Sequence, residues 1–267
     1  MTAVRFENVR FSYPSGVEAL HGVSFEVPTG QRLAIVGQNG AGKTTLVRHL
    51  NGIFQPTSGS VYVAATATTG RAIAELAASV GYVFQNPDEQ IFASTVIADV
   101  EFGPRNLGCS ADEARSRAMA ALETVGLAAE ADTHPLHLSL SERKRVALAG
   151  VLAMQTPIVV LDEPTTGQDA GGVAMVAGVV EALASAGRTV IAITHDMDFA
   201  AEHFDRVVVM AKGEVLVDGA PATVFGEADA LARAAVEPPQ LFRLAAHLGW
   251  PDRPLTVEGF VDAFERR

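Results

Sequence analysis

The sequence has little cysteine and no long uninterrupted run of apolar side chains. Among 267 residues there is one cysteine, Cys109, so neither an internal disulfide nor a cysteine-based metal cluster can form, as is typical of a reducing compartment. The longest uncharged stretch of small and apolar residues, around 170–180, ends at Glu181. A bilayer-spanning helix needs about 20 residues. The sequence therefore predicts a soluble chain that something else must hold at any membrane.

Basic residues are also scarce. Twenty Lys and Arg stand against 31 Asp and Glu, which gives a net charge of −11. Proteins that neutralise nucleic-acid phosphates usually carry the opposite sign, so we expect no nucleic-acid partner. The first seven residues show no basic region followed by an apolar core, and no signal peptide is expected. With 48% hydrophobic residues, the chain can form a packed core.

Short apolar runs recur along the chain and predict strands. They lie at 4–9, 23–27, 32–36, 158–161, 189–193 and 206–210. The second run ends at Pro28-Thr29-Gly30, and the third is followed by a glycine-rich loop and a predicted helix over 44–50. Near-continuous apolar strands separated by helices indicate a parallel sheet buried on both faces.

The middle of the chain is rich in Ala, Glu and Arg and predicts a helical insert over about 88–155. Ser110 and Glu113 have the spacing of a capping box. Helical spacing continues through Ala114, Ala118, Leu122 and Val125. We expect one core domain over 1–220 and a C-terminal extension over 221–267, made of short helices separated at Pro238-Pro239, Pro251 and Pro254.

A glycine-rich loop lies where the third strand meets the predicted helix. It reads Gly37-Gln38-Asn39-Gly40-Ala41-Gly42-Lys43-Thr44, with Thr45 next. Glycines let backbone N–H groups surround phosphate oxygens, Lys43 reaches the terminal phosphates, and the Thr44 hydroxyl ligates Mg²⁺. A glycine-rich turn with a surface lysine is the alternative, but it does not explain eight matching positions in this context. The loop therefore predicts ATP and Mg²⁺ as cofactors.

Polar side chains follow three of the predicted strands. Asp162 and Glu163 end one strand, and we expect Asp162 to hold Mg²⁺ and Glu163 to polarise the attacking water. His195 follows the next strand and would donate a hydrogen bond near the γ-phosphate, because parallel strands deliver their carboxyl ends to one edge. Gln85 ends another strand and can join the Mg²⁺ and water shell. Singly, each has a structural explanation; behind the phosphate loop they predict a catalytic site.

These motifs, in this order, resemble the nucleotide-binding subunits of ABC transporters over nearly the whole chain. The resemblance implies an α/β P-loop NTPase fold with a parallel sheet, an N-terminal antiparallel β subdomain, an inserted α-helical subdomain and a C-terminal helical tail. It also implies that Tyr13 stacks on adenine, that Gln85 is the Q-loop residue, that Asp169 is the D-loop aspartate and that His195 is the switch histidine.

Two stretches, 84–92 and 99–104, are similar to the energy-coupling factor ATPases, which serve vitamin and cobalt or nickel uptake. This resemblance implies an importer subunit that lies peripherally on the cytoplasmic face of the cell membrane. Its expected partners are a second ABC ATPase subunit, an integral membrane coupling subunit and a small solute-binding membrane protein. The coupling subunit would dock between core and insert near Gln85.

The stretch 138–142 departs from the family signature Leu-Ser-Gly-Gly-Gln. It reads Leu138-Ser139-Leu140-Ser141-Glu142. Ser139 and Glu142 keep a capping-box pattern, but Leu140 adds bulk and Glu142 adds negative charge where the family signature faces the γ-phosphate bound to the opposite subunit. We expect Ser139 to act in trans and favour a heterodimer with unequal sites over a homodimer. The alternative is that the backbone N–H of Ser141 suffices.

Three other functions fit parts of the pattern. A soluble ABC ATPase acting on nucleic acid or ribosomes would carry tandem cassettes or a long coiled-coil insert, and the acidic charge disfavours it. An unrelated P-loop kinase leaves Gln85, the 138–142 stretch and His195 unexplained. A catalytically weak, regulatory half of a heterodimer is favoured by Leu140 and disfavoured by Glu163.

Overall fold

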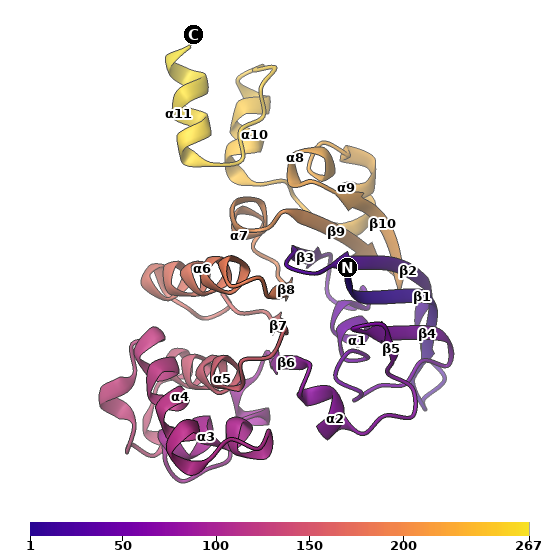
Figure 1. Ribbon diagram of the computed structural model, residues 1–267. Coiled ribbons are helices and arrows are strands. Elements are labelled where there is room, and N and C mark those ends of the chain that lie inside the picture. Colours follow the sequence, from indigo (N-terminus) through magenta and orange to yellow (C-terminus); the bar gives the residue numbers. More distant parts are fainter. Residues whose placement is uncertain (267) are drawn as a thin grey trace.

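The larger of the two sheets forms the centre of the molecule. The computed structural model describes residues 1–266, and Figure 1 shows this sheet edge-on between helices and a second sheet. Its strand order is β10-β9-β3-β8-β7-β6. The strands are β3 (Arg32–Val36), β6 (Val80–Val83), β7 (Ile158–Asp162), β8 (Thr189–Ile193), β9 (Arg206–Ala211) and β10 (Glu214–Gly219). All neighbours are parallel except β10 and β9, which confirms the predicted parallel sheet.

The smaller sheet is antiparallel, with the order β2-β1-β4-β5. Its strands are β1 (Thr2–Ser12), β2 (Glu18–Pro28), β4 (Ser58–Val63) and β5 (Thr66–Ala67). The first two runs predicted strands of five or six residues, and both strands extend to eleven because β1 pairs along its length with β2. The strands β4, β5 and β10 were not predicted, since their sequences carry only weak alternation.

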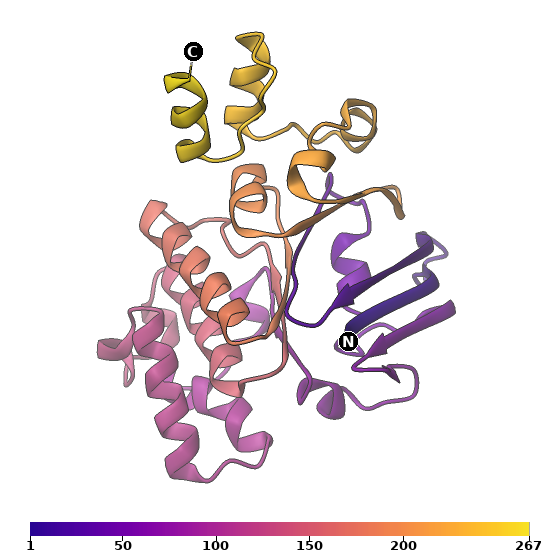
Figure 2. The ribbon, with the colours of Figure 1, turned by 45° about the horizontal axis from the view of Figure 1, so that its top comes forward.

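Alternating side chains of the central sheet fill two separate cores. Leu33 and Ile35 of β3 pack toward the antiparallel sheet and α1 (Lys43–Val47), whereas Ala34 and Val36 pack toward the helices on the other face. The helices on that face include α5 (Leu140–Met154) and α6 (Ala170–Ser185), to the left of β7 and β8 in Figures 1 and 2. A strand buried on both faces must be apolar throughout, which explains the short uninterrupted runs in the sequence.

The helical insert lies between β6 and β7 and includes α5. Before α5 come η1 (Pro87–Glu89), α3 (Val96–Asn106), α4 (Ala111–Thr124), η2 (Ala128–Glu130) and η3 (Pro135–His137). Ser110 caps α4 by accepting a hydrogen bond from the Glu113 N–H, but the Glu113 carboxylate pairs with Arg117 instead of returning the bond. The expected capping box at α4 is therefore half formed, because a nearby cation competes for the carboxylate.

Short helices connect the core elements and make up the C-terminal region. They are α2 (Ile73–Ala77), α7 (Met197–His203), α8 (Pro221–Val224), α9 (Ala228–Ala234), α10 (Gln240–His247) and α11 (Val257–Glu265). The helices α10 and α11 stand apart from the body in both ribbon views (Figures 1 and 2). A small apolar cluster lies between α10 and α11 and consists of Trp250, Ala245, Ala263 and Phe260. The division into domains at residue 220 stays a prediction.

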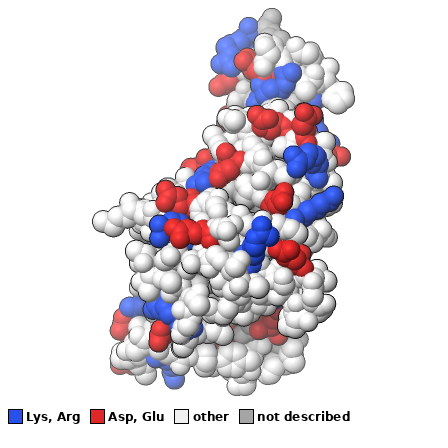
Figure 3. All heavy atoms as spheres, turned by 90° about the vertical axis from the view of Figure 1, so that its right-hand side faces the viewer, with Lys and Arg blue, Asp and Glu red and all other residues white. Residues whose placement is uncertain are grey.

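No helix among residues 1–266 is long and apolar enough to cross a membrane. The right-hand side of Figure 1, where β1, β2 and β4 lie, carries basic and acidic side chains interspersed (Figure 3). The expectation that nucleic acid is not a partner stays a prediction based on net charge.

Candidate nucleotide site

The glycine-rich loop joins β3 to α1 and has a backbone that other residues could not adopt. Gly37 has φ 146°, and a Cβ atom there would lie 2.1 Å from the Met210 carbonyl oxygen. Gly42 has φ 98° and caps α1, and a Cβ would lie 2.8 Å from the Ala19 carbonyl oxygen. Helix α1 is shorter than predicted because residues 48–50 form turns. The loop thus packs closely against β9 and β2 on one side. Its backbone on the opposite side is not covered by these strands.

Lys43 is buried beneath this loop with 6% of its surface exposed. Its Nζ donates to the carbonyl oxygens of Gly37 at 2.6 Å and Gln38 at 3.0 Å, and it lies 3.5 Å from His195 Nε2. Burial lowers the pKa of Lys43, while Glu163 and Asp162 act in the opposite direction. These contacts hold the Lys43 ammonium beside the curved backbone of the loop. A positive charge in this position can bind the negatively charged oxygens of a polyphosphate.

Asp162, at the end of β7, is 1% exposed and shares its two carboxylate oxygens between two donors. Thr44 Oγ1 donates to Oδ1 at 3.3 Å, and the Tyr82 hydroxyl donates to Oδ2 at 2.8 Å. Burial raises the pKa of Asp162, and the bond from Tyr82 partly offsets this shift. Burial together with the Asp162 charge also raises the pKa of Tyr82, so its hydroxyl stays a donor.

Glu163 follows directly with φ 54°, a left-handed backbone that costs a non-glycine residue about 1–3 kcal/mol. Its side chain is nearly fully buried, with Oε1 at 3.0 Å from His195 Nε2 and Oε2 at 3.3 Å from Thr166 Oγ1. Burial raises the pKa of Glu163, with Lys43 opposing. A carboxylate whose pKa is raised in a pocket is suited to accept a proton from water.

His195 lies just beyond β8, with 43% of its side chain exposed. Burial and the neighbouring Lys43 lower its pKa, so the imidazole is neutral at pH 7. The contact with Glu163 selects the tautomer that carries a proton on Nε2. His195 therefore donates to Glu163, and the Lys43 ammonium lies 3.5 Å from the same ring nitrogen.

One pocket unites most of the expected site residues. It is lined by Asn39, Gly40, Ala41, Gly42, Lys43, Thr44, Thr45, Gln85, Glu163 and His195. Gly37 and Gln38 lie behind it through their bonds to Lys43, and Asp162 joins it through Thr44. The Gln85 side chain is exposed at its edge. The pocket sits at the carboxyl edge of the parallel strands, as expected.

Tyr13 lies next to this pocket through its hydroxyl, which is 2.7 Å from Thr45 Oγ1. Its ring meets Phe11 and Phe54 edge to face, with centroids 5.0 and 5.6 Å apart. The residue expected to stack on adenine is thus held by one hydrogen bond to Thr45 and by aromatic contacts with Phe11 and Phe54.

Comparison with known proteins identifies the family of this chain. The family profile for ABC transporters matches residues 20–166, more than half of the chain. This chain belongs to the ABC transporter family. Members are ATPases coupled to transport, so this ABC ATPase binds ATP.

Several relatives of this ABC ATPase match over most of their length. The energy-coupling factor transporter ATP-binding protein EcfA of Methanocaldococcus jannaschii is 39% identical, with 100% of this chain and 96% of that protein covered. A putative ABC transporter ATP-binding protein of Methanothermobacter marburgensis is 42% identical, with 91% and 88% covered.

Two solved structures have a similar fold over most of this chain. CbiO1 of Clostridium perfringens, part of the ABC transporter complex cbiONQ, superposes with TM-score 0.77 at 35% identity, covering 93% of this chain and 99% of that one. The ATP-binding cassette MJ0796, in a dimeric post-hydrolysis state bound to ADP and Pi, gives TM-score 0.75 at 28% identity, with 81% and 98% covered.

Two expected residues of this ABC ATPase lie away from its own pocket lining. Ser139 caps α5 and forms the expected capping box with Glu142, whose Oε2 accepts from the Ser139 N–H and Oγ at 2.8 and 2.7 Å. Asp169 caps α6 by accepting from the Gly172 N–H at 2.7 Å. A residue that acts on the opposite subunit's nucleotide should lie outside its own pocket, so the position of Ser139 is compatible with action in trans.

The donor set fits Mg²⁺ held together with a nucleotide. Thr44 and Asp162 offer adjacent oxygen ligands, and Gln85 lies on the same pocket wall. Residues 1–266 contain no group of three or more His, Cys, Asp or Glu side chains placed to hold a metal. Mg²⁺ characteristically takes one or two protein oxygens and completes its shell with water and phosphate. The site therefore suits Mg²⁺ bound with ATP.

Sequence reasoning missed two residues that touch the catalytic group. Tyr82 donates to Asp162 from the neighbouring strand β6, and Lys144 donates from α5 to the Glu163 carbonyl oxygen at 3.2 Å. A tyrosine inside a fully buried strand is a weak signal, because its hydroxyl needs a partner. Lys144, within a basic run on a helix, has the pattern of a solvated face, and its contact depends on tertiary packing.

Proposed function

We propose that this chain is the ATP-hydrolysing subunit of an ABC importer of the energy-coupling factor class. The observation that carries the proposal is the convergence of Lys43, Asp162, Glu163 and His195 at one sheet edge. The full-length similarity to EcfA and to CbiO1, named as part of a transporter complex, supports the class.

The proposed chemistry assigns one task to each side chain. Bound Mg²⁺ would neutralise charge on the β- and γ-phosphates, held by Thr44 and Asp162 with Gln85 nearby. Lys43 would exchange its loop carbonyls for phosphate oxygens. Glu163 would accept the proton of the attacking water. The single N–H of neutral His195 would orient that carboxylate before ATP binds and donate to the γ-phosphate once ATP is bound.

Nucleotide would act by closing two subunits on each other. In this proposal Ser139 and the N-terminus of α5 contact ATP on the second subunit, and Tyr13 stacks on the adenine of this chain's own ATP. Asp169 would lie at the subunit interface. Closure would then push on an integral membrane subunit docked near Gln85, holding this chain peripherally on the cytoplasmic face, with a small solute-binding membrane protein in the same assembly.

We favour a heterodimer with a second ABC ATPase. Leu140 lies on the first turn of α5 with 48% of its surface exposed, where the family signature has glycine. Its side chain would meet the second subunit's phosphate, whereas this chain's own pocket keeps all its catalytic groups. The two sites would therefore be unequal.

The experiment purifies the tagged chain from its native membranes and measures ATPase with and without the co-purified proteins. We expect a membrane protein and a second ATPase to co-purify, and Glu163→Gln in this chain to lower turnover at least 100-fold. Full activity from the isolated homodimer would refute the unequal heterodimer. Unchanged turnover of the Glu163→Gln complex would refute the hydrolytic role.

A catalytically weak, regulatory subunit is the second candidate, and exposed Leu140 is the observation that favours it. Leu140→Gly removes the side chain from the α5 N-terminus. If the chain restrains the opposite site, this variant raises turnover of the complex; if the Ser141 backbone N–H suffices, turnover stays unchanged. The same assay with Leu136→Gly, an exposed leucine one turn before α5, is the control.

A further inference from the structure

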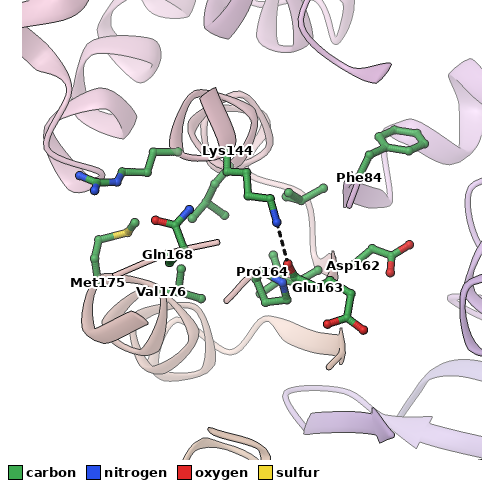
Figure 4. A pocket seen from close by; sticks show the side chains of 12 residues that line it. Phe84, Lys144, Asp162, Glu163, Pro164, Gln168, Met175 and Val176 are labelled. Carbon is green, nitrogen blue, oxygen red and sulfur yellow. Dashed lines mark hydrogen bonds between the residues drawn. The ribbon is translucent and has the colours of Figure 1, made fainter. Parts of the chain in front are cut away.

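Lys144 reaches from the second turn of α5 to the loop that follows β7. Its Nζ donates to the carbonyl oxygens of Glu163 at 3.2 Å and Thr166 at 2.7 Å. Figure 4 shows the side chain extending from the helix to Glu163, beside Pro164 and Gln168. Burial lowers the pKa of Lys144, and Glu163 and Asp162 oppose the shift, so the ammonium is retained by the charges around it.

The backbone of Glu163 needs support from its surroundings, because φ is 54°. Its N–H donates to the Ile193 carbonyl oxygen at 2.9 Å, which ties it to β8. Its carboxylate is held by His195 and Thr166. Lys144 is the donor to its carbonyl oxygen, so it fixes the peptide plane between Glu163 and Pro164.

A second contact ties the same two segments together. Ser141 Oγ donates to Gln168 Oε1 at 2.6 Å, and Gln168 Nε2 donates to the Ser141 carbonyl oxygen at 3.3 Å. With Lys144, this fixes the first two turns of α5 to residues 163–168. The segment that carries the Glu163 carboxylate therefore cannot shift relative to α5 without losing these bonds.

We propose that Lys144 is a positioning residue that holds Glu163 in its hydrolytic orientation and makes that orientation depend on the placement of α5. The inference rests on the proposed function, in which the α5 N-terminus contacts ATP on the second subunit. Occupancy of one site would then affect the hydrolytic carboxylate of the other through α5, and Lys144 is the side chain of α5 that bonds directly to Glu163. The hydrogen bonds between α5 and the loop after β7 would form the short, contiguous network that coupling between two sites uses.

The test compares Lys144→Met, Lys144→Gln and Lys212→Met in the complete membrane complex, with Mg²⁺ and ATP. Methionine keeps the length of the side chain and removes its donors, glutamine keeps a neutral donor, and Lys212 is an exposed lysine in the β9–β10 turn. We expect Lys144→Met to lower kcat about 10-fold with the Kd for ATP changed less than twofold. Lys144→Gln should recover at least a third of the wild-type kcat, and Lys212→Met should be unchanged.

A double variant separates positioning from general destabilisation. If Lys144 acts through Glu163, Lys144→Met lowers kcat no further in a Glu163→Gln background, because residues that act as a unit are non-additive. Wild-type kcat in Lys144→Met, or a full 10-fold further loss in the double variant, would overturn the inference. Wild-type kcat in Glu163→Gln alone would instead overturn the proposed hydrolytic role, so the two failures are distinct. Folding is checked by thermal unfolding, and Lys144→Gln tests the inference if Lys144→Met does not fold.

Discussion

Glu163 combines three features that oppose stability: a left-handed backbone, deep burial and a negative charge. Its folded-state pKa is raised above the ordinary 4.5 by burial. Between 4.5 and the raised value the folded protein binds more protons than the unfolded chain, so stability falls as pH rises through this window. The penalty is complete above the folded pKa, where the buried charge lowers the free energy of unfolding of the protein.

We predict that Glu163→Gln raises the Tm at pH 7 in the absence of nucleotide, because the amide keeps an acceptor oxygen and removes the buried charge. The gain should shrink as pH is lowered toward 4.5, where the wild-type carboxylate takes up its proton. Thermal unfolding from pH 4.5 to 8 measures this. Glu142→Gln, at a partly exposed carboxylate whose pKa is lowered by Ser139, is the control and should show no such gain. An equal Tm of wild type and Glu163→Gln at pH 7 would contradict the prediction.

A second prediction concerns the hydrogen bond that the Tyr82 hydroxyl donates to Asp162. Tyr82→Phe removes the donor to Asp162 Oδ2 and leaves a buried carboxylate oxygen without that partner. Because partners of metal ligands affect metal affinity by about 10–100-fold, the Mg²⁺ concentration for half-maximal ATPase should rise about 10-fold while kcat at saturating Mg²⁺ is largely kept. Tyr62→Phe, on β4 beneath Arg5, is the control. An unchanged Mg²⁺ concentration for half-maximal ATPase would show that Tyr82 does not support the metal site.

At the scale of single residues, the sequence predicted the side chains that converge at the edge of the sheet better than the residues that hold them there. Lys43, Asp162, Glu163 and His195 follow strand ends, where topology alone brings them together. The contacts from Tyr82 and Lys144 depend on which neighbouring strand and helix pack against that edge. Spacing along the chain carries no such information, so these two residues emerged from the structure.

Among the elements, α5 has the most complete N-terminus. Ser139 and Glu142 exchange hydrogen bonds there, whereas the corresponding pair at α4 makes one of the two because Glu113 pairs with Arg117. Local sequence predicted both caps equally. The difference comes from a charged neighbour one turn further on, which competes for a carboxylate.

We predict that Ser139→Ala lowers the stability of the folded chain by about 1 kcal/mol, the usual cost of losing a serine cap. This corresponds to a fall in Tm of roughly 2–4 °C. Ser110→Ala at α4 should cost less, because its cap lacks the returning bond. Thermal unfolding of the two variants, side by side, measures the difference. Equal losses would show that the Glu142 carboxylate adds nothing to the α5 cap.

Strand length and helix length were the least predictable element properties. The helix expected over 44–50 ends as α1 at Val47, and β1 runs beyond its apolar run because β2 and β4 pair with it. Partners across a sheet determine where a strand ends, and one segment cannot reveal its partners. The prolines of the C-terminal region, by contrast, marked the helix boundaries well, because they act locally.

At the scale of the whole molecule, the single tryptophan reports on one region. Trp250 stacks on Phe260, with ring centroids 4.8 Å apart, inside the small cluster between α10 and α11. The proposed ATP site lies in the large body, around β3, β7 and β8. Tryptophan fluorescence and far-UV circular dichroism therefore observe different parts of the same chain.

We predict that urea unfolds the α10–α11 cluster before the body. The fluorescence transition should have the lower midpoint and stay fixed when Mg²⁺ and ATP are added, whereas the circular dichroism transition should move to higher urea because ligand stabilises the part that binds it. Lys43→Met, which lacks the phosphate-binding ammonium, should lose the ATP-induced movement. Coincident transitions that move together with ATP would show that the C-terminal helices and the body unfold as one unit.

The position of β3 within the central sheet has a consequence for synthesis on the ribosome. Of its two neighbours, β8 is translated about 150 residues after it and β9 later still. At roughly 5–20 residues per second, the five-residue strand that leads into the phosphate loop waits about 8–30 seconds for its first partner. Until then its apolar side chains have only the early antiparallel strands and α1 to cover them. The earliest third of the newborn chain is therefore the part that most needs shielding by a chaperone.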